Sequence, residues 1–126
     1  MDRLILDTGV LVAAVRGRAT VPDDADVAIP AIVIAEYLAG VHLDQDAGRQ
    51  AADRAFLDEV LPVIPVHAYD RSVAEHHAAL LAYAARQLQR RWAHELIVAA
   101  TGRAILTSNR RARFGGLPDV NARAIT

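Results

Sequence analysis

Short apolar runs alternate with longer segments of helical periodicity, and this alternation constrains the fold more than any other feature of the chain. Each run ends at a turn signal or a polar residue, as buried strands do. The runs are residues 3–7 (RLILD), 27–30 (VAIP), 62–66 (PVIPV), 103–107 (RAILT) and 121–125 (NARAI). Strands that alternate with helices form βαβ crossovers and a mainly parallel sheet with helices on both faces. The sequence therefore predicts an α/β fold, a three-layer α/β/α domain with a central sheet of four to five strands.

The segments between these runs carry helix start signals. Asp7 or Thr8 is placed to cap the first helix, Pro30 to start the second, and Asp70 or Ser72 to cap the fourth. We expect helices over residues 7–17, 31–43, 47–61, 70–89 and 92–102, and a polar loop over 18–26.

Length and composition exclude several classes of protein. The 126 residues fit a single domain, residues 1–126, that is large enough to bury a substantial core. The chain has no cysteine and no lysine, which excludes disulfides, thiolate metal sites, catalytic lysines and the P-loop. It shows no signal-peptide pattern and no apolar stretch of the roughly 18 residues that span a bilayer. We therefore expect a cytoplasmic protein without a membrane segment.

Three carboxylates stand alone in apolar surroundings. They are Asp7 within residues 4–15, Glu36 within residues 27–41, and Glu95 within residues 92–102, where His94 is the only other titratable side chain. Burying an unpartnered carboxylate costs several kcal/mol, so such a residue is normally paired or bound to a metal. Each also has a simpler structural explanation. Asp7 can cap its helix, and the two glutamates can face solvent from a narrow polar stripe.

The positions of these acids favour a common site. Ligands of open parallel sheets bind at the carboxyl ends of the strands, where Asp7 ends the first strand and Asn109 follows the fourth. Glu36 lies about six residues into its helix and points inward if that helix packs beside the first strand. An all-oxygen set without histidine or cysteine suits Mg²⁺ or Mn²⁺ better than zinc. We therefore interpret Asp7 as a metal ligand.

Other chemical motifs are incomplete. HELIV (94–98) begins like a zinc-protease helix but has Val98 where the second histidine is required. LILDTG resembles the nucleophile strand of haloacid-dehalogenase-like phosphatases but has Gly9 where they carry a second aspartate, and a response-regulator receiver would need a lysine. His76 and His77 are adjacent on a helix and face different directions, so we interpret them as surface or interface residues.

Four segments, in order over nearly the whole chain, resemble the PIN-domain ribonucleases, specifically the VapC toxins of bacterial toxin–antitoxin pairs. LILDTGVLVAAV carries Asp7, IPAIVIAEYLAGV carries Glu36, AHELIVAAT carries Glu95, and ILTSNRRARFGGLPDV resembles the closing segment. The resemblance implies a PIN-like α/β/α domain, a homodimer, and a Mg²⁺- or Mn²⁺-dependent endoribonuclease that a cognate VapB-like antitoxin holds inactive.

The resemblance also implies roles for individual residues. Asp7, Glu36 and Glu95 become catalytic metal ligands, directly or through water, while Thr8 and Asn109 orient water or metal from beside them. A metal-activated water then attacks an RNA phosphodiester, and no covalent enzyme intermediate is needed.

Three departures from the family pattern leave reduced activity open. Glu95 stands where an aspartate is usual, and Asn109 stands at the place of a fourth acid that relatives often have. The link between AAT and GRAILT is shorter by about four residues, roughly one helical turn.

Charge is distributed unevenly along the chain. Residues 1–85 carry 13 acids and 6 arginines, whereas residues 86–126 carry 2 acids and 8 arginines. We expect RNA to lie across this basic third, near Arg110, Arg111 and Arg113, although a solvated arginine surface explains the same counts. The Ala- and Leu-rich helices 31–43 and 70–89 carry more apolar surface than one small domain covers, which also favours a homodimer and an antitoxin segment that folds on contact.

Two further hypotheses stay open. One is a PIN-like binding module that has lost catalysis but retains antitoxin or RNA binding. The other is a different phosphoryl-transfer hydrolase that uses Asp7, against which the missing second aspartate and lysine count. Retention of three isolated carboxylates favours the nuclease.

Overall fold

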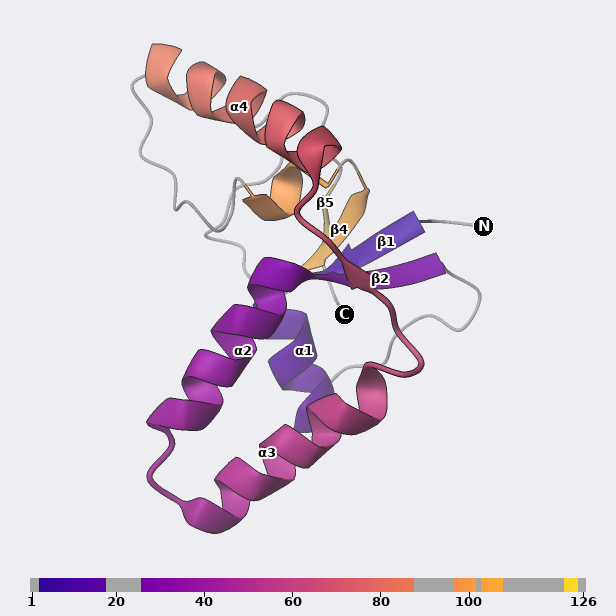
Figure 1. The fold of residues 1–126 in the computed structure, drawn as a ribbon, viewed down its shortest axis with the longest axis vertical. Coiled ribbons are helices and arrows are strands. Elements are labelled where there is room, and N and C mark those ends of the chain that lie inside the picture. Colours follow the sequence, from indigo (N-terminus) through magenta and orange to yellow (C-terminus); the bar gives the residue numbers. More distant parts are fainter. Residues whose placement is uncertain (1–2, 18–25, 88–96, 102, 108–121, 125–126) are drawn as a thin grey trace.

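The computed structural model describes residues 3–17, 26–87, 97–101, 103–107 and 122–124 (Figure 1). The strands in these ranges are β1 (Arg3–Leu6), β2 (Asp26–Pro30), β3 (Val66–His67), β4 (Ala104–Thr107) and β5 (Ala122–Ala124). The helices are α1 (Thr8–Val15), α2 (Ala31–Leu43), α3 (Ala47–Val60) and α4 (Arg71–Arg86), and residues 97–99 are also helical. None of the helices in these ranges is long and apolar enough to cross a membrane.

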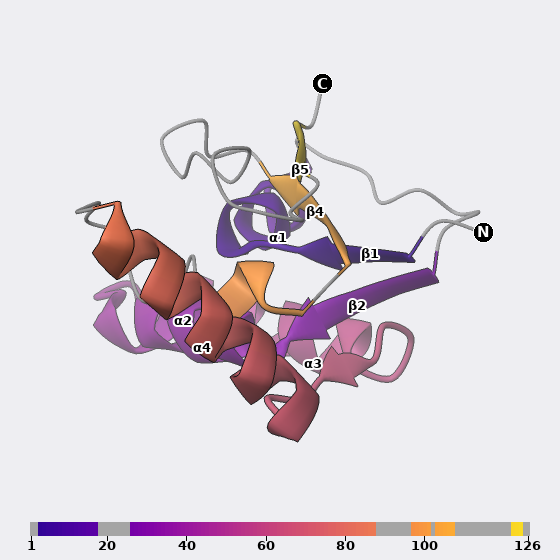
Figure 2. The same cartoon turned by 90° about the horizontal axis from the view of Figure 1, so that it is seen from above.

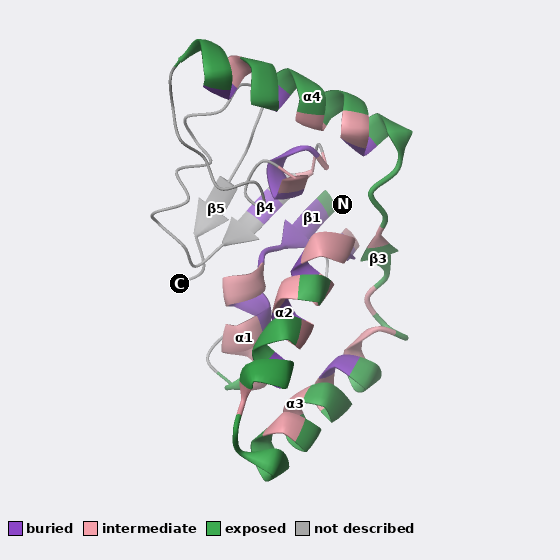
Figure 3. Cartoon of the chain, turned by 60° about the vertical axis from the view of Figure 1, so that its left-hand side comes forward, coloured by how far each residue is buried: buried purple, intermediate pink, exposed green. Residues whose placement is uncertain are grey.

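The strands form one parallel sheet in the order β3-β2-β1-β4-β5. Strand β1 is central. The chain adds β2 and β3 on one side of β1, then crosses back and adds β4 and β5 on the other side. Because βαβ crossovers are right-handed, the two directions place their helices on opposite faces. Figures 1 and 3 show α1, α2 and α3 on one side of the sheet and α4 on the other. In Figure 2, which is seen from above, α4 passes in front of α2. The predicted three-layer architecture and strand number are confirmed.

The core lies on both sides of the three central strands. Ile5, Ile29 and Ile105 are completely buried, and Ile5 and Ile105 are partners in the β1–β4 register. Strands covered on both faces read as continuous apolar runs, which is why these segments lack the alternation of a half-exposed strand. The burial colours in Figure 3 place the buried residues along β1 and on the inner sides of the helices.

Helix α2 has the boundaries that the sequence predicts. It begins directly after Pro30, which ends β2 and forms the N-cap with φ −59° and ψ 142°, so proline precedes the first helical residue rather than supplying it. Val33, Tyr37 and Val41 recur every four residues and are buried, with exposed fractions of 6% or less. This stripe fixes which face of α2 packs inward.

Polar contacts attach α3 to the first two helices. The Tyr37 hydroxyl donates to the backbone carbonyl of Asp53 at 2.7 Å, and burial raises the pKa of Tyr37. The Asp53 carboxylate pairs with Arg16, the C-cap residue of α1, with 3.6 Å between Nη2 and Oδ2. One residue of α3 thus contacts both α1 and α2.

The third strand is shorter than predicted. The sequence favours a strand over residues 62–66, but residues 61–64 form a turn and bend, and only Val66 and His67 pair with β2. Pro62 and Pro65 lack the amide hydrogen that a sheet ladder requires. The Pro65 carbonyl still accepts a hydrogen bond from the Ile29 amide at 2.9 Å, so pairing begins where proline permits it.

Candidate metal centre at the carboxyl edge of the sheet

Asp7 follows the last residue of β1, at the point where the order of the strands reverses. On one side β1 pairs with β2, which continues toward β3, and on the other it pairs with β4, which continues toward β5. Open α/β sheets bind their ligands in the crevice at this switch point. Asp7 is 7% exposed and is the one charged side chain that is buried among the described residues.

Asp7 is also the N-cap of α1, which confirms the simpler of its two expected roles. Its backbone is extended, with φ −84° and ψ 172°, and Oδ1 accepts a hydrogen bond from the Val10 amide at 3.1 Å. Its interactions extend beyond this bond. Capping alone does not call for a buried charge, because asparagine or serine caps a helix equally well. The cap therefore accounts for a polar residue at position 7 but leaves the charge to be explained.

Thr8 and Glu36 come from the two helices that flank this position. Thr8 is the first residue of α1 and is half-buried. Glu36 is half-buried on α2, three residues after Val33 and next to Tyr37, so it lies beside the inward stripe of that helix. Helices α1 and α2 pack against each other on the same side of the sheet. Glu36 thus lies at the border of the buried stripe of α2, and its predicted role as a ligand stays a prediction.

The remaining predicted site residues lie outside the described residues. These are Glu95, Asn109, Arg110, Arg111 and Arg113. The described segments on either side still locate part of the site. Strand β4 ends at Thr107, and the partnership of Leu6 with Leu106 brings that end beside the end of β1. The sequence of the closing segment therefore continues from the strand adjacent to Asp7.

The donor chemistry of the described acids fits a hard divalent cation. Asp7 and Glu36 both offer carboxylate oxygens, which Mg²⁺ and Mn²⁺ prefer, whereas zinc sites rely on histidine and cysteine. Within the described ranges no three acidic, histidine or cysteine side chains form a group that could hold a metal. The predicted third ligand, Glu95, is not among those residues.

His67 is a polar residue at this edge that sequence analysis did not single out. It ends β3, and its register partner Pro30 ends β2. Its Nδ1 atom is buried and has no hydrogen-bond partner in the described part of the structure. His67 could have been found by the pattern that identified Asp7, because both are polar residues at the end of an apolar run. The two prolines of PVIPVH made the position of the strand, and so of its last residue, hard to predict.

The adjacent histidines of α4 contact different neighbours, in line with the interpretation of His76 and His77. Nδ1 of His76 lies 3.2 Å from the carbonyl oxygen of Ala100, while Nδ1 of His77 is hydrogen-bonded to the Tyr69 hydroxyl at 2.9 Å. His77 is half-buried, and burial lowers the pKa of its imidazole. The two rings hold α4 to neighbouring segments.

Comparison with known proteins gives a fold but no sequence match. No family model and no curated protein matches the chain. VapBC2 from Rickettsia felis, solved bound to a DNA fragment from its promoter, contains a chain that matches with a TM-score of 0.82 at 18% identity, over 97% of this chain and 98% of that one. VapBC-5 from Mycobacterium tuberculosis, a toxin–antitoxin system, matches with a TM-score of 0.80 at 23% identity, over 98% and 99%. DNA-bound VapBC from Salmonella typhimurium gives 0.79 at 18%, over 98% of both chains.

These likenesses extend over nearly the full length of both chains in each comparison. At 18–23% identity they show the fold. The PIN-like α/β/α fold that four motifs implied is thereby confirmed, and it is the fold of chains from VapBC toxin–antitoxin complexes.

Proposed function

We propose that the chain is a metal-dependent endoribonuclease toxin of the VapC type, which cleaves RNA phosphodiesters and is neutralised by a cognate VapB-like antitoxin. The observation that carries the proposal is the buried carboxylate of Asp7 at the strand-order switch point of a fold shared with VapBC chains. The half-buried Glu36 supports it, because it places a second carboxylate beside the buried stripe of α2, the helix that packs against α1.

Each residue has a definite part in this proposal. Asp7, Glu36 and Glu95 hold the cation, and Thr8 and Asn109 orient water or metal from beside them. Mg²⁺ or Mn²⁺, when bound, supplies an activated water and positive charge for the phosphate oxygens. The three carboxylates also keep the site negative without the ion, so that RNA binds productively only after a cation is held. The basic closing segment with Arg110, Arg111 and Arg113 attracts the RNA backbone.

The proposed partners follow from the same fold and from exposed apolar side chains. We propose a cytoplasmic homodimer that also binds an antitoxin segment. Tyr69 is 50% exposed, and Leu81, on the helix that Tyr69 contacts through His77, is 47% exposed. Apolar side chains gathered in this way are a common feature of surfaces that bind another protein chain.

The decisive experiment separates the two roles of Asp7. Asp7→Asn keeps a good helix cap but removes the charge, so the protein should fold with nearly unchanged stability. RNA cleavage in Mg²⁺ or Mn²⁺ should fall by more than about 100-fold, because even residues behind the ligands of metal sites cost 10- to 100-fold. EDTA should abolish cleavage by the unaltered protein.

Asp58→Asn is the matched control, since Asp58 is exposed on α3. It makes the same chemical change away from the sheet edge and should leave cleavage unchanged. Undiminished cleavage by a folded Asp7→Asn protein would refute the proposed mechanism.

A catalytically weakened binding module is the second candidate function. It is favoured by the neutral Asn109 and by Glu95 in place of an aspartate. Such a module would bind antitoxin or RNA with the same fold, and its affinity would not respond to Asp7→Asn. Cleavage that is absent in every divalent metal, together with intact binding, would select this function.

A further inference from the structure

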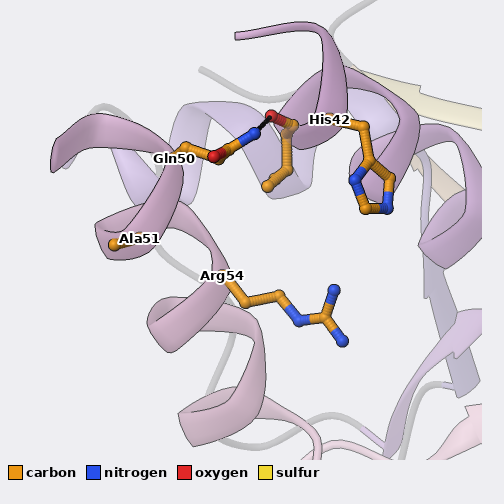
Figure 4. Close-up of a pocket in the computed structure, with 5 residues that line it drawn as sticks. His42, Gln50, Ala51 and Arg54 are labelled. Atoms are coloured by element: carbon orange, nitrogen blue, oxygen red, sulfur yellow. Dashed lines mark hydrogen bonds between the residues drawn. The ribbon is translucent and has the colours of Figure 1, made fainter. Parts of the chain in front are cut away.

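An open pocket of about 280 Å³ lies where the end of α2 meets α3 (Figure 4). It is lined by Val41, His42, Gln50, Ala51 and Arg54. Helix α2 starts at the carboxyl edge of the sheet and rises about 1.5 Å per residue, so its last turn is roughly 18 Å from that edge. Figure 1 shows this end of α2 far from the sheet. The pocket is therefore separate from the Asp7 site.

Polar contacts at the α2–α3 corner hold the walls of the pocket in place. The Arg49 side chain forms a bidentate salt bridge with the Asp44 carboxylate. The Asp46 carboxylate caps α3 by accepting a hydrogen bond from the Arg49 backbone amide. The Gln50 side-chain amide donates to the Val41 carbonyl at 3.0 Å, which satisfies one of the last carbonyls of α2. Residues 50, 51 and 54 share one face of α3 and form the opposite wall.

Arg54 differs from the other two arginines at this corner in having no carboxylate partner. Arg49 pairs with Asp44 and Arg16 with Asp53, whereas Arg54 forms no ion pair with any residue in the described ranges. Its side chain extends into the pocket, and the His42 ring faces the same space (Figure 4). A guanidinium and an imidazole thus converge on a hollow that also has an apolar lining, provided by Val41 and Ala51.

We propose that this pocket binds a carboxylate on an aliphatic stem, presented as an acidic side chain by a peptide segment of a partner protein. The Arg54 guanidinium offers a planar fork of N–H donors that matches a carboxylate, and the His42 imidazole offers another donor. Val41 and Ala51 contact the methylene stem. Leu43, which follows His42 and is 81% exposed, provides an apolar contact for a neighbouring residue of the same segment.

The charge around the pocket selects a single carboxylate over a polyanion. Between residues 42 and 59 the chain has five acids and two arginines. Arg49 pairs with Asp44 and Arg16 with Asp53, which leaves three acids against the single charge of Arg54. A nucleic-acid backbone would bring many phosphates against this acidic surface and be repelled. A peptide with one acidic side chain and otherwise neutral or basic residues can place its carboxylate at Arg54. Its basic side chains then lie near the acidic residues around the pocket. The inference is independent of nuclease activity.

Chemical-shift mapping of the full chain, labelled with ¹⁵N, tests the proposal. The probe is a blocked tetrapeptide with one glutamate, one arginine and two leucines, and the matched probe has glutamine in place of glutamate. The glutamate peptide should shift the amide signals of residues 41–43 and 50–54 and saturate at millimolar concentration. Since a hydrogen bond to a charged group contributes about 1.5–3 kcal/mol, the glutamine peptide should bind at least about tenfold more weakly.

Two variants locate the binding. Arg54→Gln should weaken the glutamate peptide about tenfold, whereas Arg86→Gln, the same change at an exposed position on α4, should leave its affinity unchanged. If Arg54→Gln disturbs the fold, His42→Ala provides a second test and should weaken binding several-fold.

Three results would overturn the proposal. Equal affinity for the glutamate and glutamine peptides would reduce the pocket to an apolar contact. Equal loss of affinity in both arginine variants would place binding elsewhere. Inorganic phosphate that binds the same residues as tightly as the glutamate peptide would make the pocket a general anion site rather than a peptide site.

Discussion

At the scale of the residue, Asp7 combines two properties that rarely coincide. It caps α1 through Oδ1, and it carries a carboxylate that is 7% exposed. A helix N-terminus favours a negative charge because of the aligned peptide dipoles, and this offsets part of the cost of burying the carboxylate. The capping position therefore helps to keep a ligand charged and fixed at the edge of the sheet. The two explanations that the sequence left open are compatible.

Asn109 is the residue whose identity most weakens the enzymatic proposal, and its replacement is informative. An amide oxygen can coordinate Mg²⁺, but it adds no negative charge to the three proposed carboxylates. The nearly isosteric Asn109→Asp change should raise metal affinity and speed cleavage at low Mg²⁺. Without metal it should lower the free energy of unfolding, because a fourth carboxylate adds repulsion between like charges.

Calorimetric metal titration and cleavage assays would measure these effects. Asn121→Asp adds the same charge elsewhere in the C-terminal part and is the control. If Asn109→Asp neither tightens metal binding nor speeds cleavage, Asn109 is not at the metal site and the alignment of the closing segment is wrong.

At the scale of the element, the boundaries of a helix or strand were predictable where residues next to them in the sequence set those boundaries. The boundaries of α2 follow from Pro30 at its start and from the polar corner that begins at Asp44, and both are readable in the sequence. The shorter β3 was also a local matter, because Pro62 and Pro65 interrupt the amide ladder within an otherwise apolar run.

Contacts between elements could not be predicted in this way. The bond from the Tyr37 hydroxyl to the Asp53 carbonyl joins residues sixteen positions apart, and no periodicity encodes it. The same holds for the pocket, because Arg54 and His42 converge only once α2 and α3 have packed. That Asp7 follows the first strand was predictable, because the end of an apolar run marks the end of a strand. That the strand order reverses at β1 could be learned only from the sheet itself.

The corner between α2 and α3 should respond to acid in a defined range. The Arg49 side chain lowers the pKa of Asp44 from 3.8 to about 2, with a smaller contribution from the Asp46 amide. Because the pKa is lower in the folded state, the stabilisation is fully present above pH 4. It is lost as the pH falls through about 2.

Arg49→Gln should raise the pKa of Asp44 toward 3.8 and move the loss of that stabilisation to higher pH. An NMR titration of the Asp44 carboxyl carbon would measure the shift. Arg71→Gln, which removes a charge from α4, should leave the pKa of Asp44 where it is. A pKa that is unchanged in Arg49→Gln would mean that the Asp44–Arg49 pair does not persist in solution.

At the scale of the whole molecule, the exposed large apolar side chains of the described residues lie in three places. Tyr69 and Leu81 are at α4, Val63 and Val66 are in and just before β3, and Leu43 is at the α2–α3 corner. We expect the α4 surface to form the homodimer interface. Its aromatic and aliphatic side chains are each about half-exposed, and a second copy of the chain would bury them. Leu81→Glu should convert a dimer to a monomer at tens of micromolar by light scattering. Leu43→Glu should not, and a strict monomer before any substitution would refute the dimer.

The uneven charge of the chain leads to the last prediction. Not every arginine of the basic third is available to RNA, because Arg103 is only 15% exposed in its side chain and pairs with Asp26 across the sheet at 3.6 Å. Arg110 and Arg111 are the proposed contacts. Single-stranded RNA releases about 0.7 counterion per phosphate contact, so Arg110→Ala/Arg111→Ala should flatten the slope of log affinity against log salt by about 1.4. It should also weaken binding similarly for different RNA sequences.

Fluorescence anisotropy with the Asp7→Asn protein, which should bind RNA without cutting it, would measure this slope between 50 and 300 mM salt, concentrations across which counterion release governs affinity. Arg71→Ala/Arg86→Ala removes two exposed arginines from α4 and is the control for net charge. A loss confined to the Arg110/Arg111 pair would assign the contacts to the closing segment. Equal changes in both double variants would mean that RNA responds to total charge, and an unchanged slope in both would leave the C-terminal arginines as a solvated surface.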